Sequence, residues 1–328
     1  MKECRLEIWE PEEYRRKKAF GFLPHMHAYV HDDEVERPGI LICPGGGYRF
    51  LSANEGRPVA LRFYELGYQC FVCTYTVNPL DLEPVGRQAL YDLGRAVRLL
   101  RSQAEKFHLD PTRLVVMGFS AGAHAAESLA VHCDDIPEEN PDLARFSARP
   151  TAAVLGYPVA TSGRFRHHDS FLALQGVGVS PEEHRYMSLE MQITPHTPPC
   201  FVWHTLGDEL VPAENSLLLL ESLRENQVKA SLVLFATGNH GLSTADARWA
   251  ACRDVDFDVR EQTDAVRQAI LDGEIPHLAD AQREEFLRQT DPDNRRPEVA
   301  SAGRTPNAEV QVWPDMANTW LREVAFKD

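Results

Sequence analysis

One serine of this chain stands between two glycines where a strand pattern meets a helix pattern. One residue separates Ser120 from Gly118 and one separates it from Gly122, and the group lies between an apolar run at 114–117 and an alanine-rich stretch at 121–131. The run is typical of a buried strand and the stretch of a helix. A tight turn between them brings two backbones together, and glycine leaves the room that this approach needs. The pattern predicts a strained turn that exposes the Ser120 hydroxyl at a helix N-terminus, where backbone N–H groups favour negative charge.

Strand and helix patterns alternate along most of the chain. Strand patterns fall at residues 4–9, 24–31, 39–43, 69–75, 113–117, 152–157, 200–204 and 229–235, and helix patterns at 57–66, 86–107, 121–131 and 212–226. This alternation predicts an α/β protein with a mostly parallel central sheet and helices on both faces. Ligands of such sheets gather at the carboxyl ends of the strands, where Ser120 would lie.

Two segments interrupt the alternation. Residues 160–199 are rich in turn residues and form a candidate cap over the site. Residues 252–308 are acid-rich, carry two helical patterns and end in a polar tract at 291–307, which favours a surface insertion over a separate functional domain. A last helix is predicted at about 312–326, packed on the sheet. Its apolar stripe consists of Val312, Trp313, Met316, Trp320 and Val324. We therefore expect the 328 residues to form one domain with helical insertions.

The charge of the chain restricts its partners. There are 49 acidic and 34 basic residues, for a formal net charge of −15. This excess disfavours nucleic acids and anionic membranes as partners, and it suits a neutral or weakly charged small molecule or oligosaccharide better. The N-terminus has no apolar segment typical of a signal peptide, and no run approaches a transmembrane helix in length, so we expect a cytoplasmic protein. Seven scattered cysteines also favour a reducing compartment.

Two further motifs have a functional and a structural interpretation. Cys70 and Cys73 have the spacing of a redox pair, but they fall in a predicted strand, where positions three apart point to opposite faces. His25 and His27 share one face of a strand, and residues 167–169 form a His-His-Asp group, so a metal-dependent deacetylase has to be weighed. No third ligand at a recognisable spacing accompanies either group. Packing or surface histidines are therefore favoured, and no metal site is predicted.

An acid and a base follow the serine in the order that its chemistry requires. A serine hydroxyl needs a base within hydrogen-bond reach, and that base needs a group to orient it. Asp208 lies in the loop after the predicted strand 200–204, and His240 lies in the loop after the next strand. Ser120, Asp208 and His240 therefore share the carboxyl edge of the sheet and form a candidate catalytic triad. Glu209 is the alternative acid.

A glycine-rich loop supplies candidate donors for an oxyanion hole. Such a hole needs two N–H groups directed at the tetrahedral intermediate. The amide of Ala121 is one candidate, and Gly46 or Gly47, directly after the third predicted strand, provides the other. The loop lacks the G-x-G-x-x-G pattern and the following lysine of phosphate-binding loops. Glu55 and Arg57 follow the loop, and we expect them to pair and hold it.

Aromatic residues stand at several predicted strand ends. The candidate substrate-binding residues are Tyr48, Phe119 and Tyr157. Phe50 is a further aromatic residue, close to Tyr48 in the sequence. Such rings can stack against a sugar. They could equally form the edge of the core, because aromatic side chains bury large apolar areas.

Four stretches of the sequence resemble a known family. CPGGGY, GFSAGAH, WHTLGDELVP and GNHGL are similar to motifs of the α/β-hydrolase superfamily, and within it to carbohydrate acetylesterases of the acetyl-xylan-esterase and BD-FAE type. The resemblance covers about residues 38–245 and resumes at the last helix. Pro44 stands where related lipases have histidine, as in the acetylesterase-like branch. Residues 252–308 are not part of the family pattern.

The resemblance implies an α/β-hydrolase fold and a function. It implies a serine esterase that removes short acyl groups, typically acetate, from sugars such as acetylated xylo-oligosaccharides, without a metal or organic cofactor. It makes Ser120 the nucleophile, Asp208 the orienting acid and His240 the base. It also assigns the oxyanion donors to the amides of Gly46, Gly47 and Ala121.

Two other functions remain open at this stage. The triad does not encode the acyl acceptor, so an arylformamidase or a small peptidase is an alternative. A member without activity that serves as a binding subunit is another, although all three triad residues are present. The sequence leaves the sugar, the acyl chain length and homo-oligomer formation open.

Overall fold

A mixed sheet forms the centre of the molecule. The computed structural model describes residues 1–251, 259–292 and 304–327. Within these residues, eight strands form one sheet in the order β1-β2-β4-β3-β5-β6-β7-β8. The strands are β1 (Lys2–Glu7), β2 (His25–Val30), β3 (Arg37–Cys43), β4 (Gln69–Thr74), β5 (Leu109–Phe119), β6 (Ala152–Gly156), β7 (Cys200–Thr205) and β8 (Ala230–Phe235). β2 pairs antiparallel with β1 and with β4, and the pairs from β4 to β8 are parallel. The predicted α/β class with a mostly parallel sheet is confirmed.

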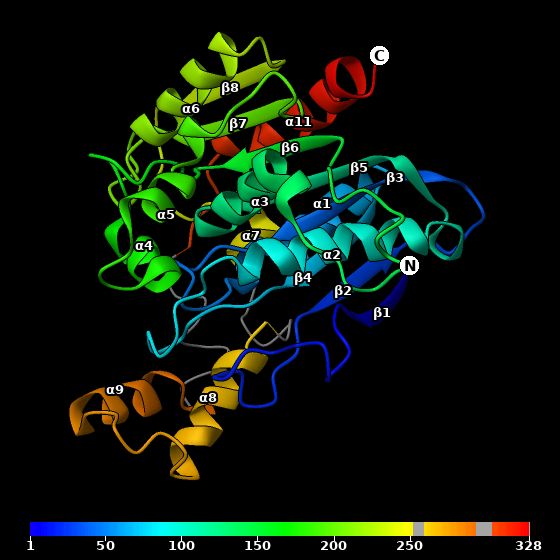
Figure 1. Cartoon of the computed structure of the whole chain (residues 1–328). Helices are drawn as coiled ribbons and strands as arrows, with labels where there is room; N and C mark the ends of the chain where they lie inside the picture. Colours follow the sequence, from blue (N-terminus) through cyan, green and yellow to red (C-terminus); the bar gives the residue numbers. More distant parts are fainter. Residues whose placement is uncertain (252–258, 293–303, 328) are drawn as a thin grey trace.

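Helices cover both faces of this sheet (Figure 1). The helices are α1 (Arg57–Glu65), α2 (Gln88–Ser102), α3 (Ala121–His132), α4 (His168–Gln175), α5 (Pro181–Tyr186), α6 (Glu214–Glu225), α7 (Ala247–Ala251), α8 (Glu261–Leu271), α9 (Asp280–Gln289) and α11 (Trp313–Trp320). Short turns are η1 (Ala53–Glu55), η2 (Glu105–Phe107), η3 (Cys133–Asp135), η4 (Leu189–Met191), η7 (Val310–Val312) and the π-helical η8 (Leu321–Ala325). α2 packs beside α3, while α1 meets α11 through the Phe63 and Trp313 rings, whose centroids lie 5.7 Å apart.

The last helix differs from the predicted stripe. Trp313 and Trp320 are buried as expected, but Val312 is 44% exposed and Met316 is 40% exposed. α11 begins at Trp313, so the helical spacing from this residue puts Ala317 and Trp320 on the buried face and turns Met316 toward solvent. The prediction was wrong for Val312, which lies in the turn η7 before the helix, and for Met316, which lies at the edge of the buried face.

The turn at Ser120 has the close backbone approach that its glycines predict. Ser120 has φ 54° and ψ −123°, a conformation that L residues rarely adopt. A Cβ atom on Gly118 would lie 2.2 Å from the Gly122 carbonyl oxygen, and one on Gly122 would lie 2.2 Å from the Cys43 carbonyl oxygen. The end of β3, the end of β5 and the start of α3 therefore meet with no space for a side chain. This contact holds the serine and the glycine-rich loop next to each other.

Gly122→Ala should destabilise the fold. The added methyl group would meet backbone atoms of Cys43 and Pro44, which cannot rotate away as a side chain can. We expect the free energy of unfolding, measured by urea denaturation, to fall by about 1–3 kcal/mol, the usual cost of overpacking. Gly163→Ala is the matched control, because the new Cβ atom would meet only the Thr161 hydroxyl, at 3.1 Å. Equal stability of the two variants would contradict the close approach.

The two segments that interrupt the alternation are helical where the structure describes them. Residues 160–199 contain α4, α5 and η4, and residues 252–308 contain α8 and α9. α8 and α9 form a small second core, whose members are Val266, Ala269, Ile270, Ile275 and Phe286, with Phe20, Leu80, Leu82, Leu278 and Leu287 packed against it. Most of the polar tract predicted at 291–307 lies outside the described residues. A single domain stays a prediction, which the packing of this core on Phe20 and Leu80 supports.

Two negative findings apply to the described part of the chain. No helix there combines the length and the apolar character needed to cross a membrane. Cys70 and Cys73 are free and fully buried in β4, where their spacing places them on opposite faces. The strand interpretation of this pair therefore agrees with the structure.

Candidate active site

The three predicted triad residues meet at the carboxyl edge of the sheet. Ser120 lies between β5 and α3, Asp208 follows β7, and His240 follows β8. Ser120 Oγ lies 2.8 Å from His240 Nε2, and His240 Nδ1 lies 2.6 Å from Asp208 Oδ2. A continuous hydrogen-bonded chain therefore runs from the hydroxyl to the carboxylate. Glu209, the alternative acid, is exposed and takes no part in this chain.

The Asp208 carboxylate is buried and well supplied with donors. Its Oδ1 accepts hydrogen bonds from the amides of Leu210 and Val211, at 3.0 and 2.8 Å. Its Oδ2 lies 3.3 Å from His204 Nε2 in addition to the contact with His240. Burial raises the pKa of Asp208, but hydrogen bonds from His204, His240 and Val211 outweigh burial and hold it below the ordinary value. The carboxylate therefore stays ionised, as a group that orients a histidine must.

The glycine-rich loop and the start of α3 present free amides beside Ser120. Gly46 and Gly47 have φ values of 130° and 64°, which favour glycine. Among the described residues, the amides of Gly46, Gly47 and Ala121 have no hydrogen-bond acceptor. Both glycines line a pocket of about 330 Å³ together with Ser120 and His240. We call this the catalytic pocket. The amides have the arrangement expected of an oxyanion hole, whose role stays a prediction.

A buried carboxyl group ties the glycine-rich loop to the floor of the site. Glu55 Oε2 accepts a hydrogen bond from the Gly45 amide, and Oε1 accepts one from the Tyr157 hydroxyl, both at 2.7 Å. Burial raises the pKa of Glu55 against these two hydrogen bonds. The expected pairing of Glu55 with Arg57 was wrong, because Arg57 instead lies 3.7 Å from Glu3. The Arg57 guanidinium stays near the surface, because moving this charge into the core beside Glu55 would cost desolvation free energy.

Glu55→Ala should impair both activity and stability. The change frees the Gly45 amide and leaves the buried Tyr157 hydroxyl without an acceptor. A loop displaced by about 1 Å can lower the rate about a hundredfold, so we expect kcat/KM for an aryl acetate to fall about ten- to a hundredfold. Urea denaturation should show a loss of about 1–3 kcal/mol. Glu55→Gln keeps one acceptor and should recover part of kcat/KM. The exposed Glu105→Ala is the control, and unchanged kcat/KM in Glu55→Ala would refute the positioning role.

The three aromatic residues predicted to bind substrate lie in the core instead. Tyr48, Phe119 and Tyr157 are 1%, 0% and 1% exposed, and none lines the catalytic pocket. The Tyr48 hydroxyl bonds to His124 Nδ1 at 2.8 Å, and Phe119 packs on the indole of the last helix. The prediction was wrong because all three rings pack into the core. The backbone has positive φ at Tyr48 and Tyr157, whereas Phe119 is the last residue of strand β5. They support the site from below.

The sequence did not place the other lining residues in the catalytic pocket. Arg49, Phe50, His167, Asp169 and Leu210 line the catalytic pocket. His167 and Asp169 come from the segment that the sequence marks as a candidate cap, but their side chains could not be placed without the fold. The sequence marks Phe50 as an aromatic residue near the loop, and it marks His167 and Asp169 only as part of the His-His-Asp group at 167–169.

The structure also bears on the metal alternative. No group of three or more metal-binding side chains occurs among the described residues. His25 Nε2 and His27 Nε2 lie 3.2 Å apart, which is a hydrogen-bond distance. Burial and the neighbouring His25 lower the pKa of His27 to about 4. Because the two rings bond to each other, this contact favours the packing interpretation.

Comparison with known proteins identifies the family. The BD-FAE family model matches residues 28–223, more than half of the chain. The chain belongs to the BD-FAE family. This BD-FAE member is 44% identical over 246 residues to endo-1,4-beta-xylanase B of Butyrivibrio fibrisolvens, an alignment that covers 75% of this chain and 39% of that protein. It is 27% identical over 210 residues to an acetylxylan esterase of Xylanibacter ruminicola, with 62% of this chain and 40% of that protein covered.

A solved structure agrees with the family. The acetyl ester-xyloside bifunctional hydrolase from Caldicellulosiruptor lactoaceticus superposes with a TM-score of 0.70 at 33% sequence identity, covering 82% of this chain and 96% of that one. The fold is therefore the α/β-hydrolase fold. The BD-FAE chain spans only about two fifths of the length of the two curated relatives above.

Proposed function

We propose that this protein is a serine carboxylesterase that removes short acyl groups, acetyl above all, from carbohydrates such as acetylated xylo-oligosaccharides. The observation that carries the proposal is the continuous contact from Ser120 through His240 to Asp208, at 2.8 and 2.6 Å, beside the free amides of Gly46 and Gly47. Family membership supports ester hydrolysis. The relatives named above support the carbohydrate as the acyl carrier.

The geometry supports a two-step acyl transfer. In the tautomer that donates from Nδ1 to Asp208, His240 Nε2 is free to take the Ser120 proton as Oγ attacks the ester carbonyl. The developing oxyanion would accept hydrogen bonds from the Ala121 amide and from Gly46 or Gly47. As the bond between the carbonyl carbon and the sugar oxygen breaks, His240 gives the proton to that oxygen, so the sugar leaves as an alcohol and an acetyl group stays on Ser120. Water, deprotonated by the same histidine, then attacks the acyl-enzyme, and His240 gives this proton to Ser120 Oγ as acetate leaves.

A panel of substrates tests the acyl bond. We would measure kcat/KM for acetylated xylo-oligosaccharides, for the same sugars esterified with longer acyl groups in place of acetate, for aryl acetates and for formyl-kynurenine. The proposal expects the acetylated oligosaccharides to give the highest values, because they alone in the panel combine an acetyl group with a sugar as the leaving group. A preference for formyl-kynurenine would instead favour an arylformamidase, and cleavage of small peptides a peptidase. Either result would overturn the proposed substrate class.

A further inference from the structure

The segment that interrupts the alternation at 160–199 contributes two polar side chains to the catalytic pocket. His167 is the residue before α4, and Asp169 lies in the first turn of this helix. Both line the pocket together with Ser120 and His240. The acyl transfer described above uses neither of them, so their place in the pocket needs another explanation.

α4 is packed against the helix that begins at the nucleophile. The buried Phe171 ring of α4 lies edge-on to the His124 ring of α3, with the ring centroids 5.6 Å apart. The carbonyl of Ala173, also in α4, accepts hydrogen bonds from the Val85 amide at 3.1 Å and from the Asn78 side chain at 3.2 Å. The start of α4 is therefore held at a set place relative to the nucleophile.

The contacts of His167 determine which of its ring nitrogens carries the proton. The Ser170 amide nitrogen lies 3.4 Å from His167 Nδ1, and the Ser170 hydroxyl lies 2.7 Å from the same atom. An amide can only donate, so Nδ1 is the acceptor and the proton of the neutral ring is on Nε2. Burial lowers the pKa of His167, Asp169 opposes this effect and His240 adds to it, so the ring is neutral at pH 7.

The N–H group at Nε2 is left as a donor for a ligand. Among the described residues, His167 Nε2 has no hydrogen-bond partner. Nδ1 faces the first turn of α4, so Nε2 lies on the part of the ring that is turned away from this helix. Since the half-buried His167 side chain lines the catalytic pocket, this N–H is placed to meet a molecule bound there.

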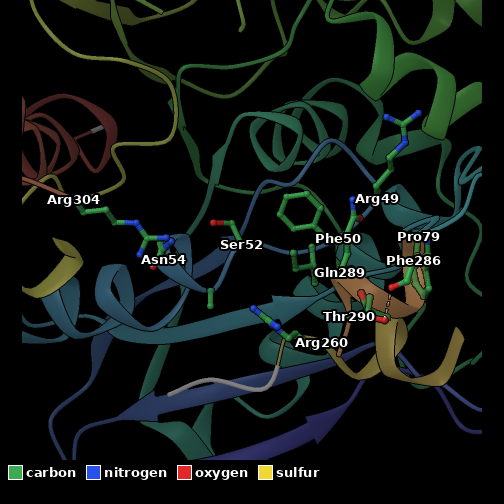
Figure 2. Close-up of a pocket in the computed structure, with 13 residues that line it drawn as sticks. Arg49, Phe50, Ser52, Asn54, Pro79, Arg260, Phe286, Gln289, Thr290 and Arg304 are labelled. Carbon is green, nitrogen blue, oxygen red and sulfur yellow. Dashed lines mark hydrogen bonds between the residues drawn. The ribbon is translucent and has the colours of Figure 1, made fainter. Parts of the chain in front are cut away.

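The Asp169 carboxylate supplies an acceptor in the same pocket. It is exposed, and its Oδ2 lies 3.5 Å from Arg49 Nη1. Arg49 makes its shorter contacts with Asp81, at 3.1 and 2.9 Å, and its side chain extends away from the Phe50 ring (Figure 2). Arg49 and Phe50 also line a second pocket, next to the glycine-rich loop, whose other side includes residues of α8 and α9. A carboxylate has about four acceptor sites, so the long contact with Arg49 leaves Asp169 able to accept from a ligand.

A donor and an acceptor in one pocket suit a leaving group with several hydroxyls. A hydroxyl group both donates and accepts, so neighbouring sugar oxygens can bond to an imidazole N–H and to a carboxylate. His240 has to give its proton to the leaving oxygen, which places that oxygen in the catalytic pocket. The ring attached to this oxygen then shares the pocket with His167 and Asp169. An alcohol with no further hydroxyl would leave both side chains without these contacts.

We infer that His167 and Asp169 determine specificity for a sugar as the leaving group. His167 Nε2 donates to one oxygen of the acylated sugar, and Asp169 accepts from a neighbouring hydroxyl. The inference rests on the proposed function, because it takes a sugar as the group that leaves. It gives the two outer members of the His-His-Asp group at 167–169 a role in recognition.

Two matched esters isolate this recognition. A mono-acetylated methyl xyloside and cyclohexyl acetate both release a secondary alcohol on a six-membered ring, but only the xyloside has free hydroxyl groups. We expect wild-type kcat/KM to be higher for the xyloside, and the ratio of the two values is the readout. His167→Asn should lower this ratio about tenfold, in line with the loss of one hydrogen bond. A wild-type ratio near one, or an unchanged ratio in His167→Asn, would overturn the inference.

A second variant of His167 separates recognition from support of α4. Asparagine is a good N-cap residue and keeps an acceptor for the Ser170 amide, but it has no group at the place of Nε2. Glutamine is longer and carries an N–H group toward that place, while it loses the acceptor at Nδ1. His167→Gln should therefore keep more of the ratio than His167→Asn. The reverse order would mean that His167 acts only through α4, and it would overturn the inference.

Variants of the two following residues complete the set. Asp169→Asn should lower the ratio about three- to tenfold, because a neutral amide oxygen accepts a hydroxyl more weakly than a carboxylate does. His168→Asn is the matched control, at an exposed residue that does not line the catalytic pocket, and it should leave the ratio unchanged. A ratio that stays the same in Asp169→Asn would overturn the assignment of the acceptor.

Direct binding distinguishes failure of this inference from failure of the proposed function. Full-length Ser120→Ala protein would be titrated in a calorimeter with acetylated xylotriose, and adding His167→Asn should raise the dissociation constant about tenfold. Wild-type protein that hydrolyses both esters equally well would remain an esterase and lose the sugar recognition. Protein that hydrolyses neither ester, but whose sugar binding weakens in His167→Asn, would lose the proposed function and retain the recognition. Absence of both hydrolysis and binding would overturn both.

Discussion

Ser120→Ala should lower kcat for aryl acetate hydrolysis by about 10⁴- to 10⁶-fold, the loss typical of removing a serine nucleophile. No other hydroxyl lies at hydrogen-bond distance from His240 Nε2 among the described residues. The substitution removes one oxygen atom from a site that is already open to the catalytic pocket, so the free energy of unfolding should stay within about 0.5 kcal/mol of the wild type. Initial rates and urea denaturation measure the two effects.

Covalent labelling separates a lost nucleophile from a lost fold. A fluorophosphonate should label wild-type protein at Ser120, as located by mass spectrometry of the peptides, and it should not label the alanine variant. Ser102→Ala, at an exposed position of α2, serves as the control and should be labelled like the wild type. Full activity in Ser120→Ala would refute the assigned nucleophile. Wild-type protein that takes up no label would favour the alternative of a binding subunit without activity.

Asp208→Asn should lower kcat about 10⁴-fold while leaving the shape of the site intact. The carboxylate keeps the proton of His240 on Nδ1, so that Nε2 can accept the proton of Ser120. An amide presents an N–H group to Nδ1 and stabilises the opposite tautomer. Its oxygen can still accept from the Val211 amide, which lies 2.8 Å from Oδ1 in the wild type. Glu209→Gln, at the exposed neighbour, should change kcat less than about twofold, and a large loss in Glu209→Gln alone would make Glu209 the acid.

The same substitution should change how stability depends on pH. Since the pKa of Asp208 is lower in the folded protein than its ordinary value of about 3.9, ionised Asp208 stabilises the fold at all pH values above about 4. This contribution is lost as the pH falls toward the lowered folded value. The difference in unfolding free energy between wild type and Asp208→Asn should therefore be largest near pH 7 and shrink below about pH 4. A difference that grows on acidification would mean that the pKa is raised.

The sequence predicted the triad because each member occupies a place set by local patterns. Ser120 is framed by two glycines, and Asp208 and His240 each follow a strand that its apolar residues identify. In a parallel sheet the carboxyl ends of neighbouring strands share one edge, so these patterns suffice to predict proximity. The Gly46 and Gly47 loop follows from the same rule.

The supporting contacts could not be predicted in this way. Tyr157 follows a strand just as Asp208 does, yet its ring turns inward and its hydroxyl bonds to Glu55. The sequence alone suggested Arg57 as the partner of Glu55, because the two residues have opposite charges and lie two positions apart in the chain. The indole of Trp313 donates to the Ser243 carbonyl at 2.7 Å and so ties the last helix to the loop of His240. Such partners, 70 or more residues apart, depend on the packing of the whole fold.

By itself, the sequence determined the alternation of strands and helices, the strained turn at Ser120, and the order of nucleophile, acid and base along one sheet edge. These features depend on the spacing of apolar residues and glycines, which acts over a few residues. Only the tertiary structure decided that Tyr48, Phe119 and Tyr157 lie in the core, that Glu55 holds Gly45, and that the inserted helices line a pocket next to the glycine-rich loop. Burial, pKa and pocket shape depend on which distant segments come into contact. The local spacing of apolar residues and glycines does not specify those contacts.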